Sequence, residues 1–353
     1  MSYAALSDVP DHAEDVLEEI RVEISASDED LAEARERRAT VLDAAGDFEG
    51  ALRTFVSGSV AHADVNNPVS DADGGVVLDR RTHDDLGPDS DDQGGPDSVM
   101  DEVRQHVMDS VRETYPLARS RLIKRAVLIK FNEPNADGVD PSVDLVVALT
   151  RKDAQGLWIP NREYDDWDAS DPEEHTRLLT AKPKSLRVHR ARVIRLVKAA
   201  IKHDSTSALI SFNIEALALT HITVVLTLGE SLQLFFDKAA SDIKAGLTED
   251  PADVSGQIKL PDGITRTRSS KRLRFFADKV QEALDNYDDR EAVESALAEL
   301  YPDQLPNAQR SSKATVADAI RRNDIAGIRS GLAITPTAII KPTRAYGHHA
   351  PSS

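Results

Sequence analysis

Three aspartates stand in strand-like surroundings and could act together on a phosphate group. Asp71 and Asp73 are two residues apart in the run Val69 to Leu78, and Asp144 interrupts the apolar run Val143 to Leu149. Because alternate residues of a strand point to the same face, Asp71 and Asp73 should lie side by side on one surface of a sheet. Asp144, on a separate strand, could complete a third corner.

Three converging carboxylates imply a compensating cation. Like charges 4 Å apart repel by roughly 4 kcal/mol at an effective dielectric constant near 20. Ligand sets made only of oxygen favour Mg²⁺ or Mn²⁺. Gly58-Ser59 follows the strand-like run Ala51 to Val56, so its backbone N–H groups and the Ser59 hydroxyl could face phosphate oxygens. Phosphates and divalent ions would then share one edge of the sheet.

Each piece of this pattern also has a purely structural interpretation. A Gly-Ser pair can be a simple turn, an Asp-x-Asp can end a strand in solvent, and an aspartate among valines can be a satisfied structural acid. The order and spacing favour a shared site, because Gly-Ser follows one strand, Asp-x-Asp stands on the next about a dozen residues later, and a third aspartate lies inside an apolar strand.

The surrounding patterns predict the elements that would position these residues. Helical spacing predicts helices from Asp28 to Gly46 and from Val99 to Thr114, and apolar runs at 126–131 and 143–149 predict buried strands. The segment 79–98 is rich in Asp, Gly and Pro, which predicts a solvated acidic loop. From Arg187 onward the spacing is helical, so the fold class is α+β with a helical second half.

Composition excludes several classes of site. At 353 residues the chain is long enough for two lobes. A net charge of −18 disfavours constitutive binding of duplex DNA. The absence of cysteine excludes disulfides, thiolate zinc sites and a cysteine nucleophile, and neither a Gly-Lys-Ser/Thr phosphate loop nor a Gly-x-Ser-x-Gly elbow is present. With no apolar run of 18 residues, we expect a cytoplasmic protein without a membrane partner.

The Gly-Ser, Asp-x-Asp and third-Asp pattern resembles the signature of the DNA polymerase beta-like nucleotidyltransferase superfamily. The segments Gly156 to Asn161 and Ile210 to Glu215 are similar to a narrower family, the cGAS/DncV-like nucleotidyltransferases (CD-NTases), bacterial relatives of oligoadenylate synthetase. The resemblance covers the chain from about Ser27 to Leu305.

The resemblance implies a domain organisation. A polymerase beta-like nucleotidyltransferase lobe, a mixed sheet with flanking helices, would occupy residues 1–184, with an N-terminal helix and the acidic loop near 79–98. A helical lobe at 185–335 would close the nucleotide cleft, and residues 336–353 would form a flexible tail. The tail segment 342–347 resembles C-termini that are conjugated to other proteins, which implies a possible conjugation partner.

The resemblance also implies roles for individual residues. Asp71, Asp73 and Asp144 would be catalytic and would hold Mg²⁺ or Mn²⁺, and Gly58 and Ser59 would position the nucleotide. Lys198 matches the family's lysine that contacts the triphosphate, and Ser211 matches the hydroxyl that assists it. Lys198 belongs to a basic stretch in which Arg187, Arg190 and Arg195 recur at helical intervals. These residues could line one wall of a cleft, or form a solvated helix face.

The implied activity joins nucleoside triphosphates into a cyclic di- or trinucleotide messenger for anti-phage signalling, sensed by a downstream effector protein. Two alternatives remain from the residues alone: a nucleotidyltransferase toxin that modifies tRNA, and a non-catalytic nucleotide-binding scaffold. Gly74-Gly75 departs from the family pattern after the Asp-x-Asp and predicts a bent strand or a loosened metal site.

Overall fold

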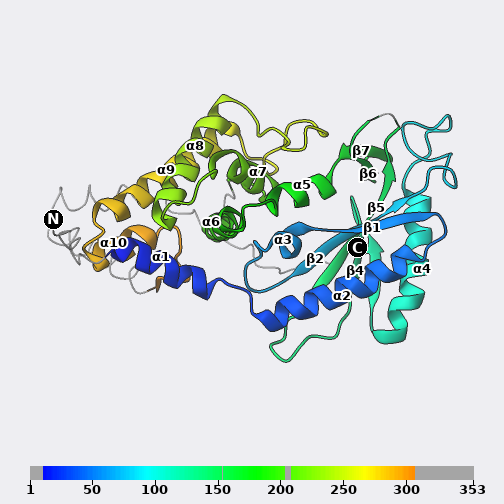
Figure 1. The fold of residues 1–353 in the computed structure, drawn as a ribbon, viewed down its shortest axis with the longest axis horizontal. Helices are drawn as coiled ribbons and strands as arrows, with labels where there is room; N and C mark the ends of the chain where they lie inside the picture. Colours follow the sequence, from blue (N-terminus) through cyan, green and yellow to red (C-terminus); the bar gives the residue numbers. More distant parts are fainter. Residues whose placement is uncertain (1–10, 153, 203–207, 307–353) are drawn as a thin grey trace, which may run out of the picture. The chain divides into compact units, whose positions relative to one another are not determined.

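The computed structural model describes residues 11–152, 154–202 and 208–306. The described residues up to Leu305 belong to one compact unit (Figure 1). Among them, no helix is both long enough and apolar enough to cross a lipid bilayer. The predicted tail at 336–353, including the segment 342–347, lies outside the described residues, and the predicted domain boundaries stay a prediction.

The strands of the described chain form one mixed sheet. They are β1 (Ala51–Ser57), β2 (Asp71–Leu78), β3 (Arg119–Leu122), β4 (Val127–Lys130), β5 (Ser142–Thr150), β6 (Leu157–Asn161) and β7 (Asp166–Ser170). The main order is β1-β2-β5-β4-β3, and β6 joins β5 to β7. Strands β2 and β5 pair in parallel, whereas every other named pair of neighbours is antiparallel.

Helices α2 (Asp28–Gly46) and α4 (Asp97–Thr114) cover one face of this sheet. The Ser27 hydroxyl accepts a hydrogen bond from the backbone N–H of Asp30 and so caps α2. Alternate residues of β5, such as Val143, Leu145 and Val147, pack into the core beneath the two helices. The opposite face of β5 is left for Asp144.

The second half of the unit is helical. Helix α5 (Pro172–Leu179) packs mainly on β1 and α3 of the sheet side, and the helical half that follows contains α6 (Lys184–Lys202), α7 (Ser211–His221), α8 (Leu228–Ala245), α9 (Arg266–Asp285) and α10 (Arg290–Leu297). The predicted α+β class, with a mixed sheet, flanking helices and a helical lobe, is confirmed. Short helix α3 (Gly58–His62) lies on the sheet side, directly after β1.

The first described helix packs with the last one. Helix α1 (His12–Glu23) contributes Val16 and Leu17 to the apolar core of the helical half and contacts α6, α8 and α10. Figure 1 shows α1, in blue, beside α10, in orange. The chain therefore crosses between the helical cluster and the sheet twice, at residues 24–27 and at residues 180–183.

The acidic segment 79–98 is more ordered than a solvated loop. The Asp89 carboxylate accepts hydrogen bonds from Arg80, from the backbone N–H of Lys152 and from the indole N–H of Trp158, at 2.7 to 2.9 Å. Leu86 is buried within the segment. The expectation of full solvation was wrong because one aspartate is used to fasten the loop to the sheet.

Gly74-Gly75 does not bend β2. The pairing of β2 with β5 runs without interruption through both glycines. A Cβ at Gly75 would overlap the ring of Phe55 on the neighbouring strand and lie 2.8 Å from the carbonyl oxygen of Val146. The glycines therefore give room to Phe55, which is a packing reason for the departure from the family pattern.

Arg37 fastens α2 to the loop that leads into β5. The side chain is 1% exposed, and its guanidinium donates to Glu33, to Asp140 and to the backbone carbonyl of Glu133. It also lies 4.8 Å from the centre of the Phe131 ring. A buried guanidinium with this many partners fixes the start of the strand that carries Asp144.

Replacing Arg37 by alanine should lower the free energy of unfolding by about 3 kcal/mol, because Asp140 and Glu33 would lose a buried cationic partner. Urea denaturation measures this change. Arg35→Ala, at an exposed position of the same helix, is the matched control and should cost less than about 0.5 kcal/mol. Equal midpoints for the two variants would contradict the anchoring role.

Candidate active site

The parallel pairing of β2 with β5 brings the three predicted acids together. Asp73 lies directly opposite Asp144, and Asp71 lies opposite Ser142 in the same ladder. Since Asp71 and Asp73 are two residues apart on one strand, all three carboxylates share the sheet face that α2 and α4 leave uncovered. The convergence that the spacing predicts is therefore present, while the catalytic role of these residues stays a prediction.

Their mutual repulsion is visible in their pKa values. Burial, followed by the charges of Asp71 and Asp144, raises the pKa of Asp73 to about 7. Burial and the charge of Asp71 raise the pKa of Asp144 to about 6. The Oδ1 atom of Asp144 is buried and has no hydrogen-bond partner in the described part of the chain.

These observations fit a divalent cation. The donor set is made of carboxylate oxygens, which are the ligands that Mg²⁺ and Mn²⁺ prefer. A bound cation would lower both raised pKa values and would give the unpartnered Asp144 oxygen a ligand role. Asp71, Asp73 and Asp144 are thus the residues that would hold the metal.

The Gly58-Ser59 corner lies directly against this acid cluster. Gly58 has a φ of +73°, and a Cβ at this position would lie 2.6 Å from the Cγ of Asp73. Only glycine combines that backbone conformation with so close an approach. Ser57, the last residue of β1, is the register partner of Asp73 and brings the corner into place.

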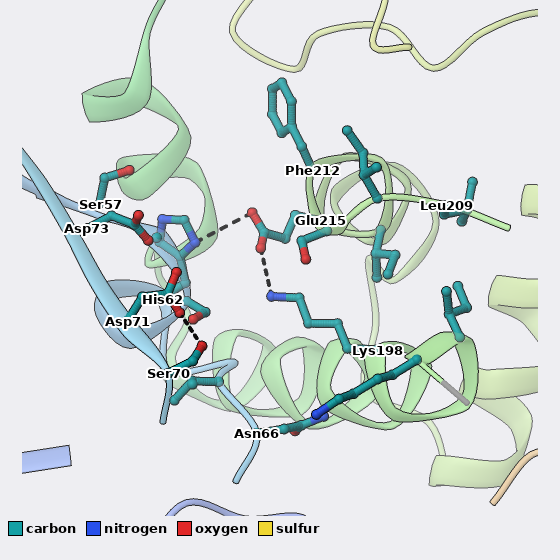
Figure 2. Close-up of a pocket in the computed structure, with 18 of the residues that line it drawn as sticks. Ser57, His62, Asn66, Ser70, Asp71, Asp73, Lys198, Leu209, Phe212 and Glu215 are labelled. Carbon is teal, nitrogen blue, oxygen red and sulfur yellow. Dashed lines mark hydrogen bonds and ion pairs between the residues drawn. The ribbon is translucent and has the colours of Figure 1, made fainter. Parts of the chain in front are cut away.

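A pocket of about 770 Å³ opens between the acids and the helical half (Figure 2). Its sheet side includes Ser57, Gly58, Ser59, His62, Asn66, Ser70, Asp71 and Asp73, and its helical side includes Lys198, Lys202, Leu209, Ser211, Phe212, Ile214 and Glu215. Six of the seven sequence-predicted site residues therefore line one pocket. Asp144 is not among the lining residues and lies next to Asp73 along the sheet.

Lys198 is held in a buried charge network that the sequence did not reveal. Its Nζ donates to Oδ1 of Asp64 and to Oε1 of Glu215, each at 2.8 Å, and the three side chains are 13%, 1% and 12% exposed. His62 Nδ1 lies 3.6 Å from Oε2 of Glu215. Figure 2 shows Glu215 between His62 and Lys198.

The lysine acts as the cation of this network. Burial raises the pKa of Asp64, and although burial alone would raise the pKa of Glu215 as well, the Lys198 charge holds it below its usual range. The two carboxylates in turn raise the pKa of Lys198 above its usual range, against the effect of burial. His62, Asp64 and Glu215 offer ligand atoms within 4.8 Å of one another, but the ammonium group is already bound by two of them.

The rest of the predicted basic wall does not form. Of the basic residues between 182 and 202, only Lys198 and Lys202 line the pocket. The buried guanidinium of Arg190 donates to the carbonyl of Ile222 just beyond the end of α7, and Arg195 donates to Ser25. Arg190 and Arg195 are used in helix packing, so of the two interpretations left open by the sequence, the cleft wall does not hold for them.

Helix α7 is fixed at the end that faces the pocket. Asn213 is fully buried, and its side-chain oxygen accepts from the backbone N–H of Ile210, which caps the helix. This places Ser211 and Phe212 on the pocket wall. The Phe212 ring lies 4.6 Å from the His175 ring, and His175 in turn contacts Asp250 at 2.6 Å.

Solved CD-NTase structures share this fold. CdnG of Bradyrhizobium diazoefficiens, solved with GTP, superposes with a TM-score of 0.61 at 15% identity, covering 86% of this chain and 98% of CdnG. E. coli MS115-1 CdnC, solved with ATP, superposes with a TM-score of 0.54 at 18% identity, covering 85% of this chain and 99% of CdnC. The Vibrio cholerae cyclic AMP-GMP synthase DncV, solved with a linear intermediate, superposes with a TM-score of 0.53 at 15% identity, covering 84% of this chain and 88% of DncV. No protein-family model and no curated protein matches the sequence. The resemblance is thus confirmed at the level of the fold.

Asp73→Asn should stabilise the metal-free protein at pH 8. A carboxyl group whose pKa rises from 3.8 to about 7 on folding binds more protons when folded, so stability falls as the pH rises through that window. Removing the charge should gain roughly 2 to 4 kcal/mol at pH 8, and the gain should shrink towards pH 5. Thermal unfolding at both pH values measures it.

The same measurement tests the metal site. Excess Mg²⁺ should raise the melting temperature of the wild-type protein at pH 8 but not that of Asp73→Asn. Asp84→Asn, at an exposed acid of the 79–98 loop, is the control and should respond to Mg²⁺ as the wild type does. An identical Mg²⁺ response in Asp73→Asn would remove Asp73 from the ligand set.

Lys198→Met should lower stability by about 3 to 5 kcal/mol at pH 8, because Asp64 and Glu215 would stay buried without their cation. Adding Glu215→Gln to that variant should restore part of the loss, since one of the stranded charges disappears. Urea denaturation compares the two variants with Lys202→Met, an exposed lysine one turn further along α6. If single and double variants unfold alike, charge neutralisation is not the role of Lys198.

Proposed function

We propose that this chain, which has the fold of the CD-NTases, is a metal-dependent nucleotidyltransferase that joins nucleoside triphosphates into a cyclic di- or trinucleotide. One observation carries the proposal: a 770 Å³ pocket holds the Gly58-Ser59 corner and Asp71 and Asp73 on one wall and Lys198 and Ser211 on the other. The solved relatives of this fold include proteins bound to GTP and ATP.

The donor nucleotide would lie between the two walls. The hydroxyls of Ser59 and Ser211 can donate to phosphate oxygens from opposite sides of the pocket. A lysine ammonium has three N–H donors, of which Asp64 and Glu215 use two, so the third can face the triphosphate. Phe212, whose ring packs against His175 at an interplanar angle of 52°, offers a planar apolar surface to a base.

The acids supply the chemistry. Asp71, Asp73 and Asp144 would hold Mg²⁺ or Mn²⁺, which when bound would neutralise the triphosphate and stabilise the leaving pyrophosphate. A hydroxyl oxygen of the acceptor nucleotide attacks the α-phosphorus, and the bond to pyrophosphate breaks in line. Asp144 would accept the hydroxyl proton as general base, because it is the acid that lies beside the donor pocket rather than in its lining.

Repetition of the step on a second nucleotide, followed by ring closure, would give a cyclic messenger. DncV, which shares the fold, is a cyclic AMP-GMP synthase, and its solved complex contains a linear dinucleotide intermediate. We extend this product class to the present chain, with a role in anti-phage signalling in the cytoplasm and a downstream effector protein that senses the product.

The purified protein, incubated with labelled ATP, GTP, CTP and UTP and with Mg²⁺ or Mn²⁺, should form a small product that resists phosphatase. Asp71→Ala/Asp73→Ala should reduce its formation by about 10³-fold or more, since both acids face the reacting phosphate. Chromatography of the labelled products measures the effect. The matched control is Asp91→Ala/Asp92→Ala, which removes two exposed loop acids.

Other outcomes would favour the alternative functions. Label transferred only to added tRNA would favour a toxin, and an absence of transfer in every mixture would favour a nucleotide-binding scaffold. Full activity in Asp71→Ala/Asp73→Ala would show that the reaction takes place elsewhere.

A further inference from the structure

A row of cations continues the sheet face that carries the acids. Residues Arg121 of β3, Leu128 of β4, Asp144 of β5 and Asp73 of β2 are successive register partners, so they form one line across four strands. In the neighbouring line, Arg119 pairs with Lys130. Because register partners and alternate residues share a face, Arg119, Arg121 and Lys130 lie on the same side of the sheet as the three acids.

These three cations are exposed and unpaired. Within residues 11–152, 154–202 and 208–306, the side chains of Arg119, Arg121 and Lys130 make no ion pair and no hydrogen bond. The next cations along the same hairpin differ, because Lys124 pairs with Glu163 and Arg125 pairs with Asp168. In a chain with a net charge of −18, acidic partners are plentiful, so a free cationic patch beside an acid cluster suits an anionic ligand.

The patch lies on the far side of Asp144 from the pocket. Neighbouring strands are about 4.8 Å apart, so Arg121 stands about 10 Å from Asp144 along the row, with the apolar side chain of Leu128 between them. The Arg121 charge acts on Asp144, where it opposes the pKa increase caused by burial and by Asp71. The donor pocket lies on the opposite side, around Asp71 and Asp73.

We propose that Arg119, Arg121 and Lys130 bind the 5′-triphosphate of the acceptor nucleotide in the step that joins two nucleotides. The inference rests on the proposed function, in which the acceptor hydroxyl lies at Asp144. One nucleotide can bridge from that hydroxyl across Leu128 to the cations. One guanidinium group can donate two parallel hydrogen bonds to the oxygens of a phosphate group. Two arginines that lie two residues apart on one strand could therefore bind a chain of phosphates.

The test compares acceptors that differ only in their 5′-phosphates. A labelled donor triphosphate is supplied with either GTP or guanosine as acceptor, and the KM of each acceptor is measured separately from kcat. The wild-type protein should prefer GTP, and Arg121→Ala/Lys130→Ala should raise the KM for GTP by about 10-fold or more while leaving the KM for guanosine unchanged. The preference should weaken as the salt concentration rises.

Lys124→Ala/Arg125→Ala is the matched control, since it removes two cations from the same hairpin outside the patch. It should keep the wild-type preference for GTP. An equal change in both double variants, or a KM for guanosine that rises as much as that for GTP, would overturn the proposal. Melting temperatures close to the wild-type value establish that the variants are folded.

Binding separates this inference from the proposed activity. Calorimetry with the α,β-methylene analogues of ATP and GTP, in the presence of Mg²⁺, should give two triphosphates per wild-type chain and one per Arg121→Ala/Lys130→Ala chain. If the wild-type protein transfers no nucleotide, the proposed function fails. The binding stoichiometry of the two proteins would still show whether the patch binds a triphosphate. Unchanged stoichiometry in the variant would overturn the patch even in an active enzyme.

Discussion

The parallel pairing of β2 with β5 is the constraint on which the rest of the site depends. It sets Asp73 against Asp144 and places Asp71 one step along the same face, which brings three anions to one spot. A protein without bound cations bears that repulsion by letting two of the carboxyl groups hold their protons up to pH values near 6 and 7. The acid cluster therefore destabilises the fold in the absence of a cation, and a bound cation would remove that destabilisation.

The surrounding residues are arranged around this imbalance. Gly58 lets the backbone approach Asp73, and the paired glycines of β2 give Phe55 its place against the sheet. Across the pocket, the chain builds a second buried charge group, in which Lys198 compensates Asp64 and Glu215. One group is thus completed by a side chain, whereas we propose that a divalent cation completes the other.

Local patterns were enough to predict the acids and the elements that carry them. Strand periodicity around Asp71, Asp73 and Asp144 depends on neighbouring residues only, so it is readable in the sequence. The partner of Lys198 was not readable, because Asp64 lies 134 residues away and no local signal marks it, although Glu215 inside an apolar helical stretch was a usable hint. The segment 79–98 was predicted to be fully solvated for the same reason. The indole of Trp158, which donates a hydrogen bond to Asp89, comes from a strand far along the chain.

The double crossing of the chain has a mechanical consequence. Residues 24–27 and residues 180–183 both join the helical cluster to the sheet, because α1 packs with α10 rather than with the strands. A single linker would let one half swing in any direction. Two connections leave one easy motion, a rotation about the line through both of them. The two walls of the pocket can therefore move apart and together while the sheet and the helical cluster each stay rigid.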